Sequence, residues 1–237
     1  MLRNHFVFDG ESSLDFGIGI SGSGTYDKPS RRTEKVSVPG RNGDLILENG
    51  SYENIDYSFP CYIVEELPLR IEAFAAMLLS KKGYKRLEDT YHPGYYRMGV
   101  YKDGIDVTTG TLNQYGKFDI TFDCKPQRYL HSGENAIVFE ESGIISNPTR
   151  FASRPLLRVW GAGVVGIGDQ SITINVANEY TDIDCDISEA YKDSYVNNCN
   201  GNIRLSGLNF PELEPGDNGI MLDGVDKVEI IPRWWTL

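Results

Sequence analysis

The sequence predicts a mainly β protein: a β-sandwich or barrel-like domain with one α-helix, followed by a second β-sandwich domain. Three observations lead to this fold class. Apolar and polar residues alternate along most of the chain, as in strands with one buried face. One segment has helical spacing instead. In the second half, short strand-like runs follow one another at intervals of about ten residues, which is typical of a sandwich or jelly roll.

Three runs in the first half carry the clearest alternation. The run "LDFGIGI" (14–20) places its large apolar residues on one face, which predicts a half-buried strand. The runs "NIDYSFPCYI" (54–63) and "KFDITFDC" (117–124) repeat the pattern. Pro60 lies on the opposite phase of the second run. Because proline cannot donate to a strand ladder, Pro60 predicts an edge or a bulge.

Two dipeptides, Asn42-Gly43 and Asn49-Gly50, divide the stretch from 38 to 64. Both residue types accept positive φ, so each dipeptide predicts a hairpin turn. The same stretch contains no histidine and no acidic residue in a pocket-like apolar setting. The stretch therefore offers no candidate residues for catalysis.

One amphipathic helix is predicted over 67–83, "LPLRIEAFAAMLLSKKG". Its apolar residues have the i, i+3, i+4, i+7, i+8 spacing of a helix with one buried face. They are Ile71, Phe74, Ala75, Leu78 and Leu79. Pro68 fits near the first helical position and Gly83 fits just past the end.

A domain boundary is predicted near Ser132–Gly133, within "CKPQRYLHSGENAI", where proline, glycine and polar residues interrupt the strands. The expected domains are therefore 1–132 and 133–237. The second is expected to contain about eight short strands. The clearest are "PLLRVWG", "SITINVA", "EYTDIDCDI", "NIRLSG", "NGIMLDG" and "DKVEIIPRWW".

The composition narrows the possible functions. The 237 residues include 23 basic and 34 acidic side chains, a formal charge of −11, which argues against a general nucleic-acid binder. No apolar leader and no run of 18 apolar residues is present, so we expect neither a signal peptide nor a membrane-spanning helix. The cysteines lack C-x-x-C spacing and are expected to be reduced thiols, mostly buried. They are Cys61, Cys124, Cys185 and Cys199.

Several short motifs match known binding or catalytic sites but lack the neighbouring elements that such sites need. Two G-x-G-x-x-G matches, "GIGISG" (17–22) and "GAGVVG" (161–166), are not followed by the helix that a dinucleotide site needs, so we interpret both as hairpin glycines. Asp182, Asp184 and Asp186 share one strand face and are expected to face solvent; calcium binding is the alternative. The three histidines, His5, His92 and His131, suggest no local catalytic triad.

Two features leave other functions open. The tryptophans Trp160, Trp234 and Trp235 are expected in a core or an interface, but tryptophans on a sandwich also stack on sugars. A cell-wall hydrolase would need two facing carboxylates, and pairs such as Glu140–Glu141 are by default turn charges.

Long blocks of the sequence resemble the siphophage distal tail proteins (Dit). The first block is "VPGRNGDLILENGSYENIDYSFPCYI", which is followed by the single amphipathic helix. The others follow in the family's order: "CKPQRYLHSGENAI", "NPTRFASRPLLRVWGAG", "YTDIDCDISEAYKD" and "FPELEPGDNGI". Together they span nearly the whole chain.

The resemblance implies a structural role and supplies no catalytic residue, cofactor or metal ligand. It implies a first domain that closes into a homo-hexameric ring and a galectin-like second domain. The ring would join the tail tube protein to tail-tip, tail-associated and receptor-binding baseplate proteins, with the tape measure protein as a further partner. The protein would be assembled in the host cytoplasm and lie at the virion tail tip. With −11 charges per chain, we expect an acidic or neutral ring lumen.

The candidate subunit interface consists of turn residues that could reach a neighbouring copy: Gly40, Arg41, Asn42, Gly43, Asn49 and Gly50. The alternative function is a carbohydrate-binding module for adhesion to the host surface. Its candidate sugar-stacking residues are Trp160, Trp234 and Trp235. Exposed, clustered tryptophans beside polar groups would favour it.

Overall fold

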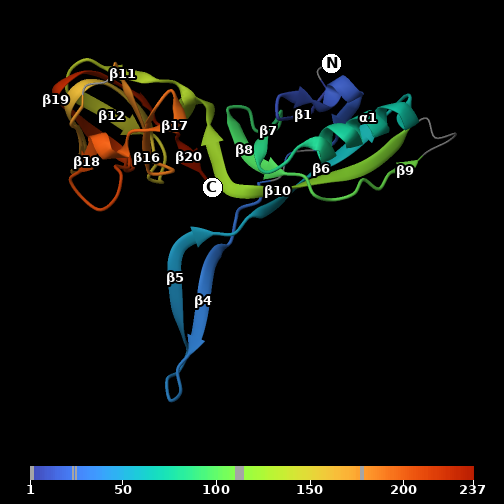
Figure 1. Cartoon of the computed structure of the whole chain (residues 1–237). Helices are drawn as coiled ribbons and strands as arrows, with labels where there is room; N and C mark the ends of the chain where they lie inside the picture. The colour runs from blue at the N-terminus through green and yellow to red at the C-terminus, as the bar shows by residue number, and fades with distance from the viewer. Residues whose placement is uncertain (1–2, 23, 25, 110–114, 177–178) are drawn as a thin grey trace. The chain divides into compact units, whose positions relative to one another are not determined.

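The computed structural model describes residues 3–22, 24, 26–109, 115–176 and 179–237 (Figure 1). It contains two compact units. One ends at Arg128 and also includes Leu237, and the other is Tyr129–Thr236. Both are built mainly from strands, as the sequence predicts. No helix in the described part of the chain has the length and apolar character needed to cross a membrane.

The first unit is built on a sheet with the strand order β2-β1-β7-β8-β10-β6-β3. Its strands are β1 (Phe6–Phe8), β2 (Glu11–Ser12), β3 (Ile18–Ile20), β6 (Ile55–Ile63), β7 (Lys85–Asp89), β8 (Tyr95–Val100) and β10 (Gly116–Leu130), and β9 (Thr108–Thr109) pairs with β10. A separate two-stranded sheet is formed by β4 (Arg31–Ser37) and β5 (Asp44–Tyr52).

The alternation predicted for β6 and β10 is confirmed. Every second residue is buried along β6 and along residues 116–126 of β10, and the two strands pair antiparallel without a register shift, for example Ile120 with Phe59. Pro60 therefore lies in no bulge. Its carbonyl accepts from the backbone N–H of Ser21, so its nitrogen also faces the side on which β3 runs. No donor is lost from the β6–β10 ladder.

The strand predicted over 14–20 is wrong in its first half. Ser13–Phe16 form a 3₁₀ turn, and only Ile18–Ile20 are extended. Two side chains cap this turn. Ser12 Oγ accepts from the backbone N–H of Leu14, and Asp15 Oδ2 accepts from the backbone N–H of Ser12. Gly17 ends it with φ 72°. This local capping overrides the apolar alternation.

The predicted helix is present as α1 (Leu67–Ser80), and in Figure 1 it lies along the sheet of the first unit. Phe74 and Leu78 are fully buried and Ile71 is partly buried against the same core. Leu79, expected on this face, is 60% exposed, and Met77 is buried instead. Each residue turns the helix by about 100°, so Leu79 is carried away from the face centred on Phe74 and Leu78.

The second unit is one sheet that forms two layers. Its strands are β11 (Ile137–Phe139), β12 (Gly143–Asn147), β13 (Leu156–Ile167), β14 (Gln170–Ile174), β15 (Thr181–Asp184), β16 (Glu189–Lys192), β17 (Ser194–Asn198), β18 (Ile203–Leu205) and β19 (Gly216–Ile231). The last strand of the chain, β20 (Trp235–Thr236), pairs with β10 instead. The first half of β13 pairs with β15 and its second half with β14. Correspondingly, β19 pairs with β12 at its start and with β11 at its end.

Both long strands change partners at an irregularity in their shared ladder. The register shifts at Trp160/Gly161 and again before Val164. Gly161 and Gly163 have positive φ, and a Cβ at Gly163 would lie 2.2 Å from the carbonyl oxygen of Asp223. These glycines therefore form a bulge and not the hairpin turn expected for 161–166. For the same reason, runs expected as separate short strands are parts of β13 and β19.

Candidate assembly surface

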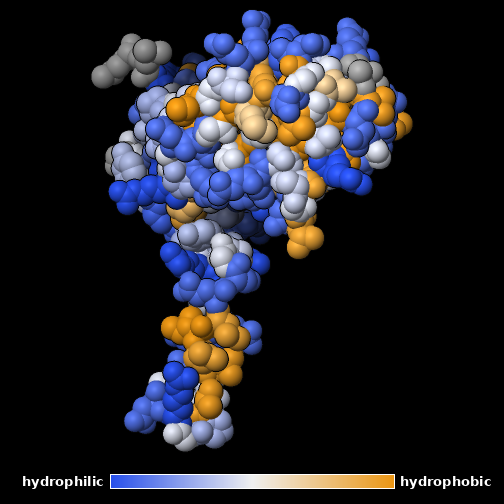
Figure 2. Space-filling view, turned by 90° about the vertical axis from the view of Figure 1, so that its left-hand side faces the viewer, coloured by the Kyte–Doolittle hydropathy of each residue, from blue (hydrophilic) through white to orange (hydrophobic). Residues whose placement is uncertain are grey.

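The β4–β5 hairpin is the most exposed element of the first unit. Val36 pairs with Leu45, and Glu34 pairs with Leu47, so these four side chains share one face of the hairpin. Leu45, Ile46 and Leu47 are 38%, 56% and 47% exposed. Figure 2 shows apolar side chains gathered along the hairpin.

An isolated two-stranded hairpin with exposed apolar side chains is unusual on the surface of a protein that stays monomeric. Within the described part of the chain each strand pairs only with the other, so both outer edges carry unpaired backbone groups. A two-stranded sheet is at best marginally stable alone. The ion pair between Arg31 and Glu48, at 3.1 Å, is exposed on both sides and adds little. Exposed apolar side chains beside open edges are typical of a surface that becomes covered on assembly.

The six candidate interface residues lie at two places in this hairpin. The first four, from Gly40 to Gly43, form the tip between β4 and β5, where Gly40 has φ 81° and Gly43 has φ 79°. Asn49 and Gly50 do not form a turn. They lie inside β5, where the register shifts between Arg31 and Thr33 of the opposite strand.

The error at Asn49-Gly50 has a simple cause. A bulge needs positive φ as much as a hairpin turn does, and Gly50 adopts φ 75°. The Asn49 side chain accepts from the backbone N–H and the hydroxyl of Ser51, which holds the extra residues in place. Only the pairing of the two strands distinguishes a bulge from a turn.

The tryptophans have separate surroundings. Trp234 is buried in the core of the second unit. Trp235 is partly buried, stacks on Phe151 at 4.5 Å and donates from Nε1 to the carbonyl of Ala152. The ammonium of Lys227 lies 3.8 Å from the ring centre of the partly buried Trp160. Sugar stacking by these residues stays a prediction.

The acids of the β15 strand do not face solvent as expected. Asp182 and Asp184 are buried, and only Asp186 is exposed. The guanidinium of Arg158 donates to both oxygens of Asp182 at 2.6 and 2.9 Å. This hydrogen bonding raises the pKa of Arg158.

Arg233 holds Asp184 in the same bidentate way, also at 2.6 and 2.9 Å. Burial would raise the pKa of Asp184, but the hydrogen bonds and charge of Arg233 outweigh it and lower that pKa. The acids therefore serve as partners for arginines. No group of three or more His, Cys, Asp or Glu residues placed to hold a metal occurs in the described part of the chain.

One polar cluster gave no signal in the sequence. Nδ1 of His92 lies 3.0 Å from the Tyr57 hydroxyl and 3.1 Å from Oδ1 of Asp89. The same Asp89 oxygen accepts from the backbone N–H groups of Tyr91 and His92. These contacts fix the loop after β7. No serine or cysteine nucleophile takes part in them.

The cysteines behave as predicted for Cys61, Cys124 and Cys185, which are free and buried, while Cys199 is partly exposed. Burial raises the pKa of each of the three buried thiols to about 12. A thiolate is therefore disfavoured at these positions.

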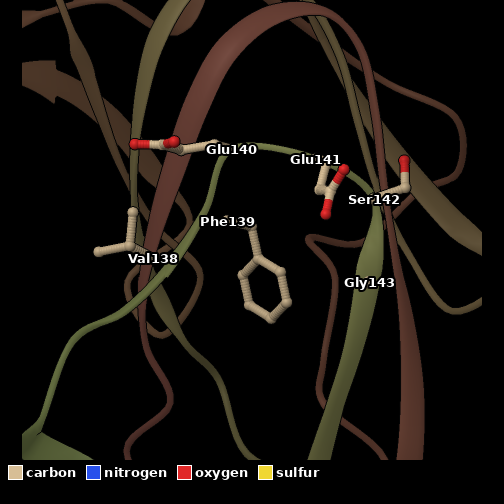
Figure 3. A pocket seen from close by; sticks show the side chains of 6 residues that line it. All are labelled: Val138, Phe139, Glu140, Glu141, Ser142 and Gly143. Atoms are coloured by element: carbon tan, nitrogen blue, oxygen red, sulfur yellow. The ribbon is translucent and has the colours of Figure 1, made fainter.

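A hollow in the second unit is lined by the segment that joins β11 to β12 (Figure 3). Its residues are Val138, Phe139, Glu140, Glu141, Ser142 and Gly143. Figure 3 shows the Phe139 ring inside the hollow and the two glutamate side chains pointing in different directions. Two carboxylates across a cleft, which glycoside hydrolysis requires, are not formed by this pair.

Comparisons with known proteins identify the first unit. Residues 12–124 match the model of the family described as phage tail protein RIFT-related domain. This match covers just under half of the chain and nearly all of its first unit. The resemblance to siphophage distal tail proteins is thereby confirmed, and the protein's role is structural, as a phage tail component. No curated protein sequence matches the chain.

Solved structures share the fold of this phage tail protein. Dit (gp 19.1) of phage SPP1, described as a paradigm of the hub adsorption apparatus in Gram-positive infecting phages, is 12% identical, with all of both chains covered and a TM-score of 0.75. A chain of the phage P2 baseplate in its activated conformation with Ca is 14% identical, with 97% of each chain covered and a TM-score of 0.55. The corresponding structure with Sr gives 13%, 97% and 0.53.

Proposed function

We propose that this phage tail protein is a distal tail hub, in which six copies close into a ring between the tail tube and the tail tip. The observation that carries the proposal is the β4–β5 hairpin, with its exposed Leu45, Ile46 and Leu47 and its two open edges. We propose that the hairpin of each copy lies on the next copy. The sixfold number comes from the resemblance to the distal tail proteins, and the chain shares the fold of one of them.

A hairpin that reaches a different surface on its neighbour makes a head-to-tail contact. Such contacts close into a ring when the rotation per copy divides a full turn, and every copy then has the same interface. Ring closure would cover the apolar side chains and the edges that the isolated chain leaves in water. The tip residues Gly40–Gly43 and the bulge residues Asn49 and Gly50 are the proposed interface positions within the hairpin.

The proposed partners follow from the position of a hub. The tail tube protein would bind one face of the ring, and tail-tip and receptor-binding baseplate proteins the other, with the tape measure protein ending nearby. The net charge of −11 suits a lumen that does not hold DNA phosphates. No catalytic step is proposed. Stoichiometric metal in elemental analysis, or turnover of cell-wall glycan by the purified chain, would contradict this.

Native mass spectrometry and electron microscopy test the ring. We expect closed six-copy rings of the wild type at high concentration or in assembled tails. Leu45→Ser together with Leu47→Ser should shift the population toward single chains without lowering the melting temperature, because both side chains are exposed in the single chain. Val196→Ser in β17, where the side chain is 89% exposed, is the matched control. A trimer or an open filament would refute the hub.

A further inference from the structure

Two arginines of the first unit have buried side-chain nitrogens without hydrogen-bond partners in the described part of the chain, and the exposed Lys28 lies beside one of them. Arg97 occupies an inward-facing position of β8 and is only 7% exposed. Its guanidinium lies 5.1 Å from the ring centre of Tyr57. Its Nη1 is buried and has no hydrogen-bond partner among the described residues.

The second cation is Arg128 on β10, the strand next to β8 in the sheet. Its guanidinium lies 5.0 Å from the ring centre of Tyr95. Nη2 donates to the carbonyl oxygen of Leu237 at 3.0 Å, and the Lys28 ammonium donates to the same oxygen. Nε of Arg128 is buried without a partner in the described part of the chain.

These charges repel one another. Burial lowers the pKa of Lys28, and the charges of Arg128 and Arg97 lower it further. Burial also lowers the pKa of Arg97, and the charge of Arg128 adds to that effect. The acceptor that Arg128 and Lys28 share, the Leu237 oxygen, is one atom for two cations. The nearby Asp89 carboxylate already accepts from two backbone N–H groups and contacts His92.

A buried charge without a counter-charge lowers the stability of the folded state. A buried guanidinium N–H without an acceptor lowers it further. Arg128 and Lys28 share the Leu237 carbonyl oxygen, and Arg97 lies on the strand next to that of Arg128. Guanidinium and ammonium groups are the side-chain groups that bind carboxylate and phosphate oxygens. We infer that Arg97, Arg128 and Lys28 form a binding site for a small oxyanion, a phosphate or a carboxylate. The inference concerns the first unit alone and does not depend on ring formation.

Inorganic phosphate, titrated into the full-length chain against chloride at equal ionic strength, tests the site. We expect saturable shifts of the side-chain Nε–H signals of Arg97 and Arg128 in ¹⁵N NMR spectra. We also expect a saturable rise of about 10 °C in the melting temperature of the first unit when phosphate exceeds its Kd about a hundredfold.

Substitutions then separate a specific site from a general salt effect. Arg97→Met should abolish the phosphate-dependent rise, while its melting temperature without phosphate stays equal to or above that of the wild type, since an unpaired buried charge is removed. Arg204→Met in β18, an exposed position, should retain the full rise. An equal response to chloride and phosphate, or an undiminished rise in Arg97→Met, overturns the inference. Should Arg97→Met fail to fold, the wild-type NMR titration decides, and unsaturable or absent shifts at Arg97 and Arg128 overturn it.

Discussion

Phe74→Ala should destabilise the first unit strongly. The Phe74 ring is fully buried and lies 5.8 to 6.2 Å from the rings of Phe6, Phe16 and Phe118. Truncation of a buried phenylalanine typically costs about 3–5 kcal/mol. Phe6 is itself packed against the rings of Phe59 and Phe122, so it has little freedom to move into the cavity. We therefore expect about 4 kcal/mol.

The assay can follow each unit separately. All three tryptophans, Trp160, Trp234 and Trp235, lie in the second unit, so their fluorescence reports its unfolding. The only α-helix of the described residues is α1, so ellipticity at 222 nm has a contribution specific to the first unit. With a urea dependence of about 2 kcal/mol per molar, a loss of about 4 kcal/mol lowers the ellipticity midpoint by about 2 M.

Leu79→Ala is the matched control, since Leu79 lies on the same helix but is 60% exposed. Its effect should stay within about 0.5 kcal/mol. Equal, small shifts in the two variants would refute the packing of α1 described above. Such a result would instead indicate that the Phe74 face is exposed in the single chain and covered by another subunit.

Three further predictions concern the rest of the chain. Limited proteolysis should not cut first between residues 125 and 133, the linker expected from the sequence, because β10 continues to Leu130 and Gly133 is buried; first cuts in this segment would show that the junction opens readily. Asp184→Asn should cost about 3 kcal/mol because it breaks a buried ion pair, whereas the exposed Asp186→Asn should cost little. Because the pKa of Asp184 is lowered in the folded state, the stability that its carboxylate contributes is complete above about pH 4 and is lost as the pH falls through the folded-state pKa. Acid unfolding monitored by tryptophan fluorescence should show this pH-dependent loss in the wild type and not in Asp184→Asn. The same pH profile in both proteins would refute the ion pair as its cause. Iodoacetamide at pH 8 should alkylate Cys199 well before the other three cysteines, which mass spectrometry of peptides will show; equal rates would mean that the buried thiols open readily.

Residue spacing was sufficient to predict the buried side chains of a strand or helix that packs on its own domain core. The alternation in β6 and β10 predicted each buried residue, and the helical spacing located Phe74 and Leu78. Pattern failed where partners come from elsewhere in the chain. The arginine that covers Asp184 is 49 residues away, and only the strand pairing brings it there.

The assembly surface shows the same limit. The sequence located the hairpin tip, because Gly40 and Gly43 require positive φ. It could not show that Leu45 and Leu47 stay uncovered in the single chain, since an apolar strand residue is normally buried in its own domain. The charges of Arg97 and Arg128 were likewise invisible in the pattern, because they lie at positions where strands usually carry apolar residues.

The sharing of β13 and β19 between both layers of the second unit has a mechanical consequence. Neither layer can peel away without breaking the ladder that continues into the other, so the two should open as one cooperative unit. Amide hydrogens in β14 and β15, which lie in different layers, should then exchange through the same opening event. For a component of a tail that is pulled and pushed during attachment, such continuous strands would transmit load through the backbone, where separate layers would slide on side-chain contacts alone.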